Sequence, residues 1–119
     1  MHVLNVAFMS PRASSPTWHQ PVMVEEVLDL LRPRADAVIV DATVGTGGHS
    51  LALLPRLLPD GRLIAIDRDP AALELTRARL TAFQPLVHLE QDNYRNLESL
   101  LLRLGCPHVD GLLLDLGVL

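Results

Sequence analysis

The sequence contains no lysine, so all ten of its basic residues are arginines. With 14 acidic residues, the formal net charge is −4 at pH 7. A surface that holds nucleic acid by its phosphates needs clustered basic side chains. If the protein acts on RNA or DNA, we therefore expect most of the phosphate-contacting surface to come from further sequence or from a partner.

Cysteine and long apolar runs are also scarce. The single cysteine, Cys106, cannot form a disulfide within the chain, and no paired Cys or His spacing suggests a metal site. The longest apolar runs are well under the roughly 18 residues of a membrane span, and no basic start precedes an apolar run as in a secretory signal. These absences favour a cytoplasmic protein with no membrane partner.

Aromatic residues make up only 3% of the chain, although 49% of it is hydrophobic. The core must therefore be aliphatic, and stacking of several exposed bases on aromatic side chains is not expected. An aliphatic core of one domain suits a parallel sheet covered by helices.

Apolar runs and helical periods alternate along the chain. Apolar positions from Val24 to Leu31 have helical spacing, and Pro33 ends that helix. The later pattern predicts strands at 38–41, 62–67, 86–90 and 109–115, with helices near 48–58, 70–82 and 94–104 between them. This alternation predicts an α/β fold, a parallel doubly wound sheet of the Rossmann type.

Local signals refine the helix ends. Asp69 is placed to cap a helix that starts at Pro70, and Gly105 is placed to end the last helix. Pro55 conflicts with a helix over 48–58, so we expect that helix to kink there or to end early.

The two ends of the chain carry separate expectations. Residues 1–18 show no sustained period and are predicted to be a loosely ordered leader, with a short pairing strand at 3–8 as the alternative. Residues 19–119 form the predicted domain. Since no helix pattern follows the fourth predicted strand, we expect the sheet to be truncated there and the chain to be the front part of a larger protein.

A glycine-rich turn follows the first predicted strand. The segment 42–49 reads ATVGTGGH, and Asp67 ends the next strand 19 residues after Gly48. This spacing is typical of nucleotide-binding folds, where the acid accepts hydrogen bonds from ribose hydroxyls. Ser50 stands where the dinucleotide fingerprint needs its third glycine, and Asp41 would repel a pyrophosphate. A ligand with a positive amino acid end, such as S-adenosylmethionine, suits the turn better than NAD.

Three ordered motifs carry a family resemblance. They are DATVGTGGHS at 41–50, preceded by HQPV at 19–22, then GRLIAIDRDP at 61–70, and VDGLLLDLGV at 109–118. Together they resemble the ribosomal RNA small-subunit methyltransferase H family. The resemblance implies a Rossmann-like S-adenosylmethionine-dependent methyltransferase that methylates N4 of a cytosine in 16S rRNA, so the implied partner is 16S rRNA or the small ribosomal subunit.

The resemblance also implies site residues, although none is assigned as catalytic. Asp67 resembles the ribose-binding acid, Tyr94 an aromatic residue near the adenine, and Asp115 the acid beside the cofactor. The full implied cofactor set is Gly47, Gly48, His49, Asp67, Tyr94 and Asp115. Asp115 is the only candidate in this chain for taking the proton of the target amine.

Plainer interpretations remain open at these positions. The glycines can serve only a tight turn, Tyr94 can fill the core against Leu97, and Asp115 can cap a strand end. At the level of function, the alternatives are a truncated, catalytically inactive cofactor-binding fragment or interaction module, and an NAD-dependent oxidoreductase domain.

Overall fold

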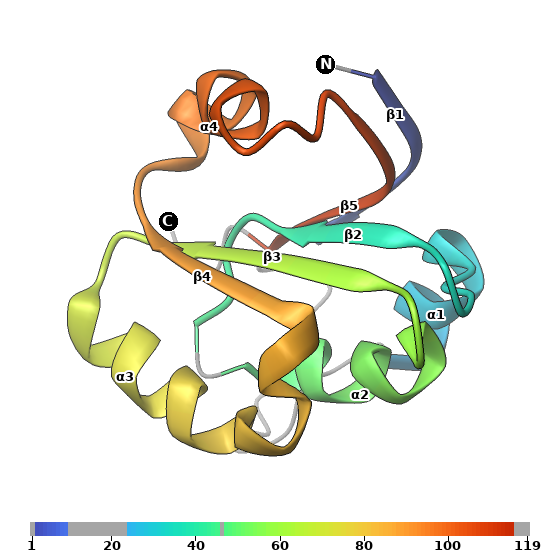
Figure 1. The fold of residues 1–119 in the computed structure, drawn as a ribbon, viewed down its shortest axis with the longest axis horizontal. Coiled ribbons are helices and arrows are strands. Elements are labelled where there is room, and N and C mark those ends of the chain that lie inside the picture. Colours follow the sequence, from blue (N-terminus) through green and yellow to red (C-terminus); the bar gives the residue numbers. More distant parts are fainter. Residues whose placement is uncertain (1, 10–23, 46, 116–119) are drawn as a thin grey trace.

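The computed structural model describes residues 2–9, 24–45 and 47–115. Five strands lie in it, namely β1 (His2–Met9), β2 (Val38–Asp41), β3 (Arg62–Asp67), β4 (Val87–Gln91) and β5 (His108–Asp115). All pair in parallel, in the order β1-β5-β2-β3-β4 (Figure 1). The interiors of the central strands β2, β3 and β5 consist mainly of Val, Ile, Leu and Ala, as a sheet buried on both faces requires.

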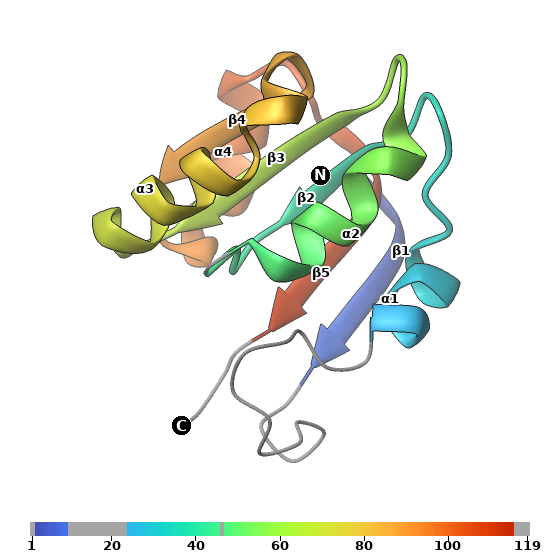
Figure 2. The same cartoon turned by 90° about the horizontal axis from the view of Figure 1, so that it is seen from below.

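Helices cover both faces of the sheet, which confirms the predicted doubly wound fold. α1 (Val24–Leu31), α2 (Gly48–Leu57) and α3 (Pro70–Arg79) lie on one face, and α4 (Leu97–Arg103) lies on the other (Figures 1 and 2). α1, α2 and α4 bury leucines at helical spacing, which in α4 are Leu97, Leu100 and Leu101, whereas α3 buries Leu73 and Thr76. The sheet therefore separates two aliphatic cores.

The caps predicted from sequence are confirmed. The side chain of Asp69 accepts a hydrogen bond from the N–H of Ala71 (2.9 Å) at the start of α3, with Pro70 as its first residue. Gly105 has a φ of +73° and follows α4, where its N–H and that of Cys106 donate to the carbonyls of Leu102 and Leu101. This Schellman arrangement is why a glycine ends α4.

Proline positions account for the differences in helix bounds. α2 continues two residues past Pro55 and ends at Leu57, since a proline in the last turn removes only one helical hydrogen bond. The helix predicted at 70–82 was too long, because α3 ends at Arg79 and a 3₁₀ segment, Thr81–Leu86, follows. Phe83 has non-helical backbone angles within that segment (φ −112°, ψ 16°), and Pro85 has no N–H with which to continue a helix.

The prediction of a loosely ordered leader is wrong for residues 2–9, and the alternative, a short pairing strand, is confirmed. These residues form β1, which pairs with β5 over its length. Pairing satisfies backbone groups that would otherwise be exposed along the edge of β5. The strand was hard to see in the sequence because apolar residues fall on both of its faces. Residues 10–18 lie outside the described residues.

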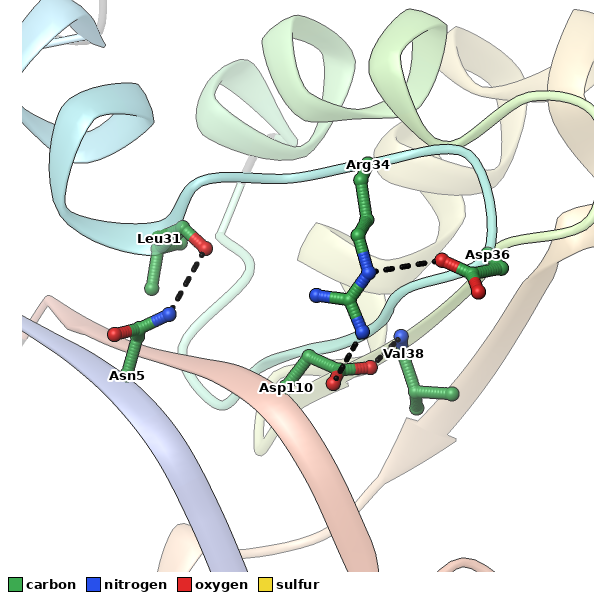
Figure 3. Close-up of polar contacts among 6 residues, drawn as sticks. All are labelled: Asn5, Leu31, Arg34, Asp36, Val38 and Asp110. Carbon is green, nitrogen blue, oxygen red and sulfur yellow. Dashed lines mark hydrogen bonds and ion pairs between the residues drawn. The ribbon is translucent and has the colours of Figure 1, made fainter.

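A carboxylate joins β5 to the start of β2. Asp110 accepts hydrogen bonds from the N–H of Val38 (2.8 Å) and from Nη2 of Arg34 (3.0 Å), which also contacts Asp36 (Figure 3). The hydrogen bond from Arg34 to Asp110 raises the pKa of the guanidinium. Asp110 thus gives the first residue of β2 a partner and helps to fix its register.

We expect Asp110→Ala to lower the free energy of unfolding by about 1–3 kcal/mol, because it leaves the N–H of Val38 without its acceptor. Arg34→Ala is the matched control and should cost clearly less, since it removes only an exposed ion pair. Urea unfolding of both variants measures this. Equal losses would show that the ion pair, and not the backbone hydrogen bond, is what matters.

Candidate functional site

Three acids lie at the carboxyl ends of the three central strands. Asp41 on β2 is in register with Ala65 on β3 and Leu113 on β5, so Asp67 and Asp115 each lie two residues further along the neighbouring strands. Ligands of open α/β sheets bind at this edge. The fold therefore brings Asp41 close to Asp67, which lies 26 positions later in the chain, and to Asp115, which lies a further 48 positions on.

A cleft of about 170 Å³ opens at this edge. Two predicted site residues, Asp67 and Tyr94, line it, together with Ala42, Thr43, Arg68 and Asp92. Tyr94 begins a 3₁₀ turn, Tyr94–Asn96, and is 38% exposed, which excludes the interpretation that it only fills the core. The volume is below the roughly 300 Å³ of a small-molecule pocket, so the cleft has room for part of a cofactor.

The glycine turn is anchored to β3 and α3. The N–H of Gly45 donates to Oδ2 of Asp67 (2.8 Å), and the hydroxyl of Thr76 donates to the carbonyl of Gly45 (2.7 Å). At Gly47 φ is +84°, and a Cβ there would lie 3.2 Å from Cγ2 of Thr76. Both the backbone conformation and the close packing of the turn therefore require glycine at 47.

Gly47, Gly48 and His49 lie at the N-terminus of α2 and are not among the residues that line the cleft. Gly47 is the N-cap, and no described side chain caps this helix end. Nδ1 of His49 is buried and has no hydrogen-bond partner among the described residues. Burial lowers the pKa of His49, and the charge of Asp115 opposes that shift. The imidazole is thus neutral at pH 7 and retains an unused polar atom.

Asp115, the third of the strand-end acids, is tied to the turn through its backbone. Its N–H donates to the hydroxyl of Thr43 (2.7 Å), the residue that follows β2 by two positions. The charge of Asp115 acts on both His49 and Asp41. The structure therefore places Asp115 near the helix N-terminus as well as beside the cleft residue Thr43.

Asp41 is buried beneath the turn, with only 1% of its surface exposed. It accepts hydrogen bonds from the hydroxyl of Ser50 (2.8 Å) and the N–H of Thr43 (3.3 Å). Burial raises its pKa to about 6, the two hydrogen bonds oppose this, and the charges of Asp115 and Asp67 add to it. Asp41 therefore braces the turn and acts on a ligand only through its charge.

The electrostatics of this edge favour a cationic ligand. Asp41, Asp67, Asp92 and Asp115 all lie around it, while the cleft lining contributes one cation, Arg68. A pyrophosphate would be repelled by these carboxylates. Among the described residues, no group of three or more His, Cys, Asp or Glu side chains could hold a metal ion.

Sequence reasoning missed several residues of this site, among them Thr43, Asp92 and Thr76. Thr43 and Asp92 line the cleft, and Thr76 is fully buried where it holds the turn. Asp92 could have been found by the rule that found Asp67, because it directly follows the end of the next strand, β4. Thr76 gives no such signal, since its partner Gly45 lies 31 residues away in the sequence.

A larger cleft, of about 370 Å³, lies away from these residues. Its lining comes from α3, the following 3₁₀ segment and β4, and includes Arg77, Gln84 and Leu89. None of the predicted site residues takes part in it.

No helix in the described part of the chain is long and apolar enough to cross a membrane.

Comparison with known sequences gives a consistent result. The model of the MraW methylase family matches residues 16–119. The ribosomal RNA small subunit methyltransferase H of Natranaerobius thermophilus is 44% identical over 100 residues, covering 84% of this chain and 32% of that protein. The protein of the same name from Parafrankia sp. is 54% identical over 103 residues, covering 84% and 31%. The chain thus spans just under a third of the length of these relatives.

Solved structures agree on the fold. A putative rRNA methylase from Clostridium thermocellum aligns with a TM-score of 0.54 and 26% identity over 56% of this chain and 37% of that one. TrmN from Thermus thermophilus aligns with a TM-score of 0.58 and 26% identity over 66% and 24%. A SAM-dependent O-methyltransferase from Thermotoga maritima, 18% identical with a TM-score of 0.58 over 66% and 31%, supports the fold alone.

The buried carboxylate of Asp41 predicts a specific pH dependence. Its pKa is near 3.8 when unfolded and about 6 when folded, so the folded state binds more protons between these values. The free energy of unfolding should fall as the pH rises from about 4 to about 7, by an amount on the order of 3 kcal/mol.

Asp41→Asn should flatten this dependence, because an amide keeps the buried position without a charge. Ser50→Ala is the companion variant, and it should extend the fall to higher pH because it removes a hydrogen bond that lowers the pKa. Urea unfolding at a series of pH values tests both. An unchanged slope in Asp41→Asn would assign the pH dependence to other groups.

Proposed function

The chain belongs to the MraW methylase family, as the resemblance of its motifs predicts, and from that premise we propose that it forms the S-adenosylmethionine-binding part of an rRNA methyltransferase. The observation that carries the proposal is the set of strand-end carboxylates around a glycine turn. The curated relatives are named for methylation of small-subunit rRNA. The proposed partner is accordingly 16S rRNA or the small ribosomal subunit, which implies a cytoplasmic site of action.

The residues present fit this cofactor. S-adenosylmethionine carries positive charge on its sulfonium and its ammonium group, and the carboxylates of Asp41, Asp67 and Asp115 create a negative potential that attracts cations. The buried, unpartnered Nδ1 of His49 and the uncapped N-terminus of α2 offer polar groups for the methionine portion. We assign Gly47, Gly48 and His49 to that portion.

Asp67 and Tyr94 are assigned to the adenosine portion. Asp67 already accepts backbone hydrogen bonds from Gly45 (2.8 Å) and Asp69 (3.0 Å), one on each oxygen. Each carboxylate oxygen has a second lone pair that can accept a ribose hydroxyl. The exposed ring of Tyr94 lines the same cleft and offers a face for stacking on the adenine.

Asp115 is the proposed proton acceptor of the reaction. When bound, the cofactor supplies an electrophilic methyl group on its sulfonium sulfur. The N4 amine of a cytosine is a weak nucleophile, because its lone pair is delocalised into the ring, and it must lose a proton when it is methylated. The carboxylate of Asp115, at the end of β5 and beside the proposed cofactor site, would accept that proton.

A second function, a cofactor-binding fragment or interaction module without independent activity, is favoured by one observation. The cleft of about 170 Å³ is smaller than a pocket for a whole cofactor. The NAD alternative is disfavoured by the carboxylates, which would repel a pyrophosphate.

Calorimetry with the purified 119-residue chain tests cofactor binding. We expect S-adenosylmethionine to bind and NAD not to bind. Asp67→Ala should weaken binding about 10- to 100-fold, because hydrogen bonds to a charged acceptor are lost. Asp69→Ala is the control, since it removes the helix cap beside Asp67 and leaves that carboxylate in place. A folded chain that binds neither ligand would contradict the proposal.

Tyr94 gives an independent test of the adenine assignment. Tyr94→Phe should keep the affinity for S-adenosylmethionine, because the ring face remains, whereas Tyr94→Ala should weaken it about 3- to 10-fold. Adenosine, as a competing ligand, should show the same pattern. Equal affinities of the two variants for S-adenosylmethionine would show that the adenine does not stack on Tyr94.

A further inference from the structure

Strand β1 lies outside the residues matched by the family and forms one edge of the sheet. The match begins at residue 16, whereas β1 spans His2–Met9. Natural edge strands are usually short, or carry charges, proline or a bulge that prevents pairing with another chain. The segment HVLNVAFM has eight residues and none of Asp, Glu, Lys, Arg, Pro or Gly. By these criteria, nothing in the sequence of β1 prevents its outer edge from pairing with a strand of another chain.

The hydrogen-bonding groups on this edge can be assigned. The N–H of His2 donates to the carbonyl of Pro107 at the start of β5, so it points toward the sheet. Along a strand the N–H and C=O of successive residues point to alternate sides. Val3, Asn5 and Ala7 therefore direct their N–H and C=O groups outward, and β1 has no second strand partner in the described part of the chain.

Two apolar side chains accompany these groups. Leu4 is 61% exposed and Val6 is 50% exposed, and their spacing of two places them on the same face of β1. The other face is directed toward α1, where the side-chain amide of Asn5 donates to the carbonyl of Leu31 (3.4 Å, Figure 3). Unpaired backbone groups and an exposed apolar pair thus lie along the same strand.

We propose that β1 pairs with β1 of a second copy of this chain, antiparallel across a two-fold axis at Asn5. Asn5 then faces Asn5 of the other copy, Val3 faces Ala7, and Leu4 faces Val6. Each outward residue exchanges both of its backbone hydrogen bonds, and the Leu4 and Val6 side chains form cross-strand pairs. An uncharged strand is self-complementary, because the pairing brings no like charges together.

The opposite edge of the sheet, β4, explains why pairing through β1 ends at a dimer. β4 has only five residues, and its Glu90 is paired with His88 (2.9 Å) and Arg103 (3.5 Å). An edge of this kind resists strand addition. Pairing of β1 with β4 would build open chains of molecules, whereas pairing of β1 with itself ends at a dimer.

Analytical ultracentrifugation over a concentration series, with circular dichroism to confirm folding, tests the proposal. The unmodified chain should show a monomer–dimer equilibrium. Leu4→Lys/Val6→Lys places lysines opposite each other in the two copies and should weaken the dimer about tenfold or more. A folded chain that stays monomeric at all concentrations, or that forms open-ended oligomers, would overturn the proposal.

The matched variant Leu4→Lys/Val6→Glu tests the register. In the proposed pairing each lysine at position 4 faces a glutamate at position 6, so dimerisation should return to near the level of the unmodified chain. Asn5→Pro removes an outward N–H without removing a bond to β5 and should also weaken the dimer. If Leu4→Lys/Val6→Glu is folded but no better at dimerising than the double lysine variant, this antiparallel register is wrong.

Discussion

The short central strand β2 is the element on which the rest of the arrangement depends. Its four residues pair with β3 on one side and β5 on the other, and Asp110 supplies an acceptor for its first N–H. Because both neighbours are parallel to it, their carboxyl ends meet at the same edge. A slip of one residue would turn Asp41 away from Ser50 and separate Asp67 from the glycine turn.

The glycine turn gains its shape from contacts that are distant in the sequence. Asp67 holds the N–H of Gly45, and Thr76 holds its carbonyl, so β3 and α3 fix the turn from outside. Asp67 therefore has two roles, one as a structural acceptor and one as the proposed ribose acceptor. A residue with both roles links the integrity of the site to that of the fold, which is why cofactor affinity and stability must be measured together.

Asp41 shows a different relation between stability and function. Burying a carboxylate is unfavourable, and the raised pKa records that cost. Its hydrogen bonds to Ser50 and Thr43 offset part of it and hold the turn against the start of α2. The resulting negative charge lies beneath the proposed cofactor site, where a cationic ligand would be stabilised and an anionic one repelled.

The sequence alone determined the order of the elements from α1 to β5, their caps at Asp69, Pro70 and Gly105, and the glycine turn with its acid at Asp67, because periodicity and capping act over a few residues. Only the tertiary structure decided that β1 is a strand, that Thr76 holds Gly45 and that Asp41 is buried. These outcomes depend on contacts between distant segments, whose pairing and burial no local pattern encodes.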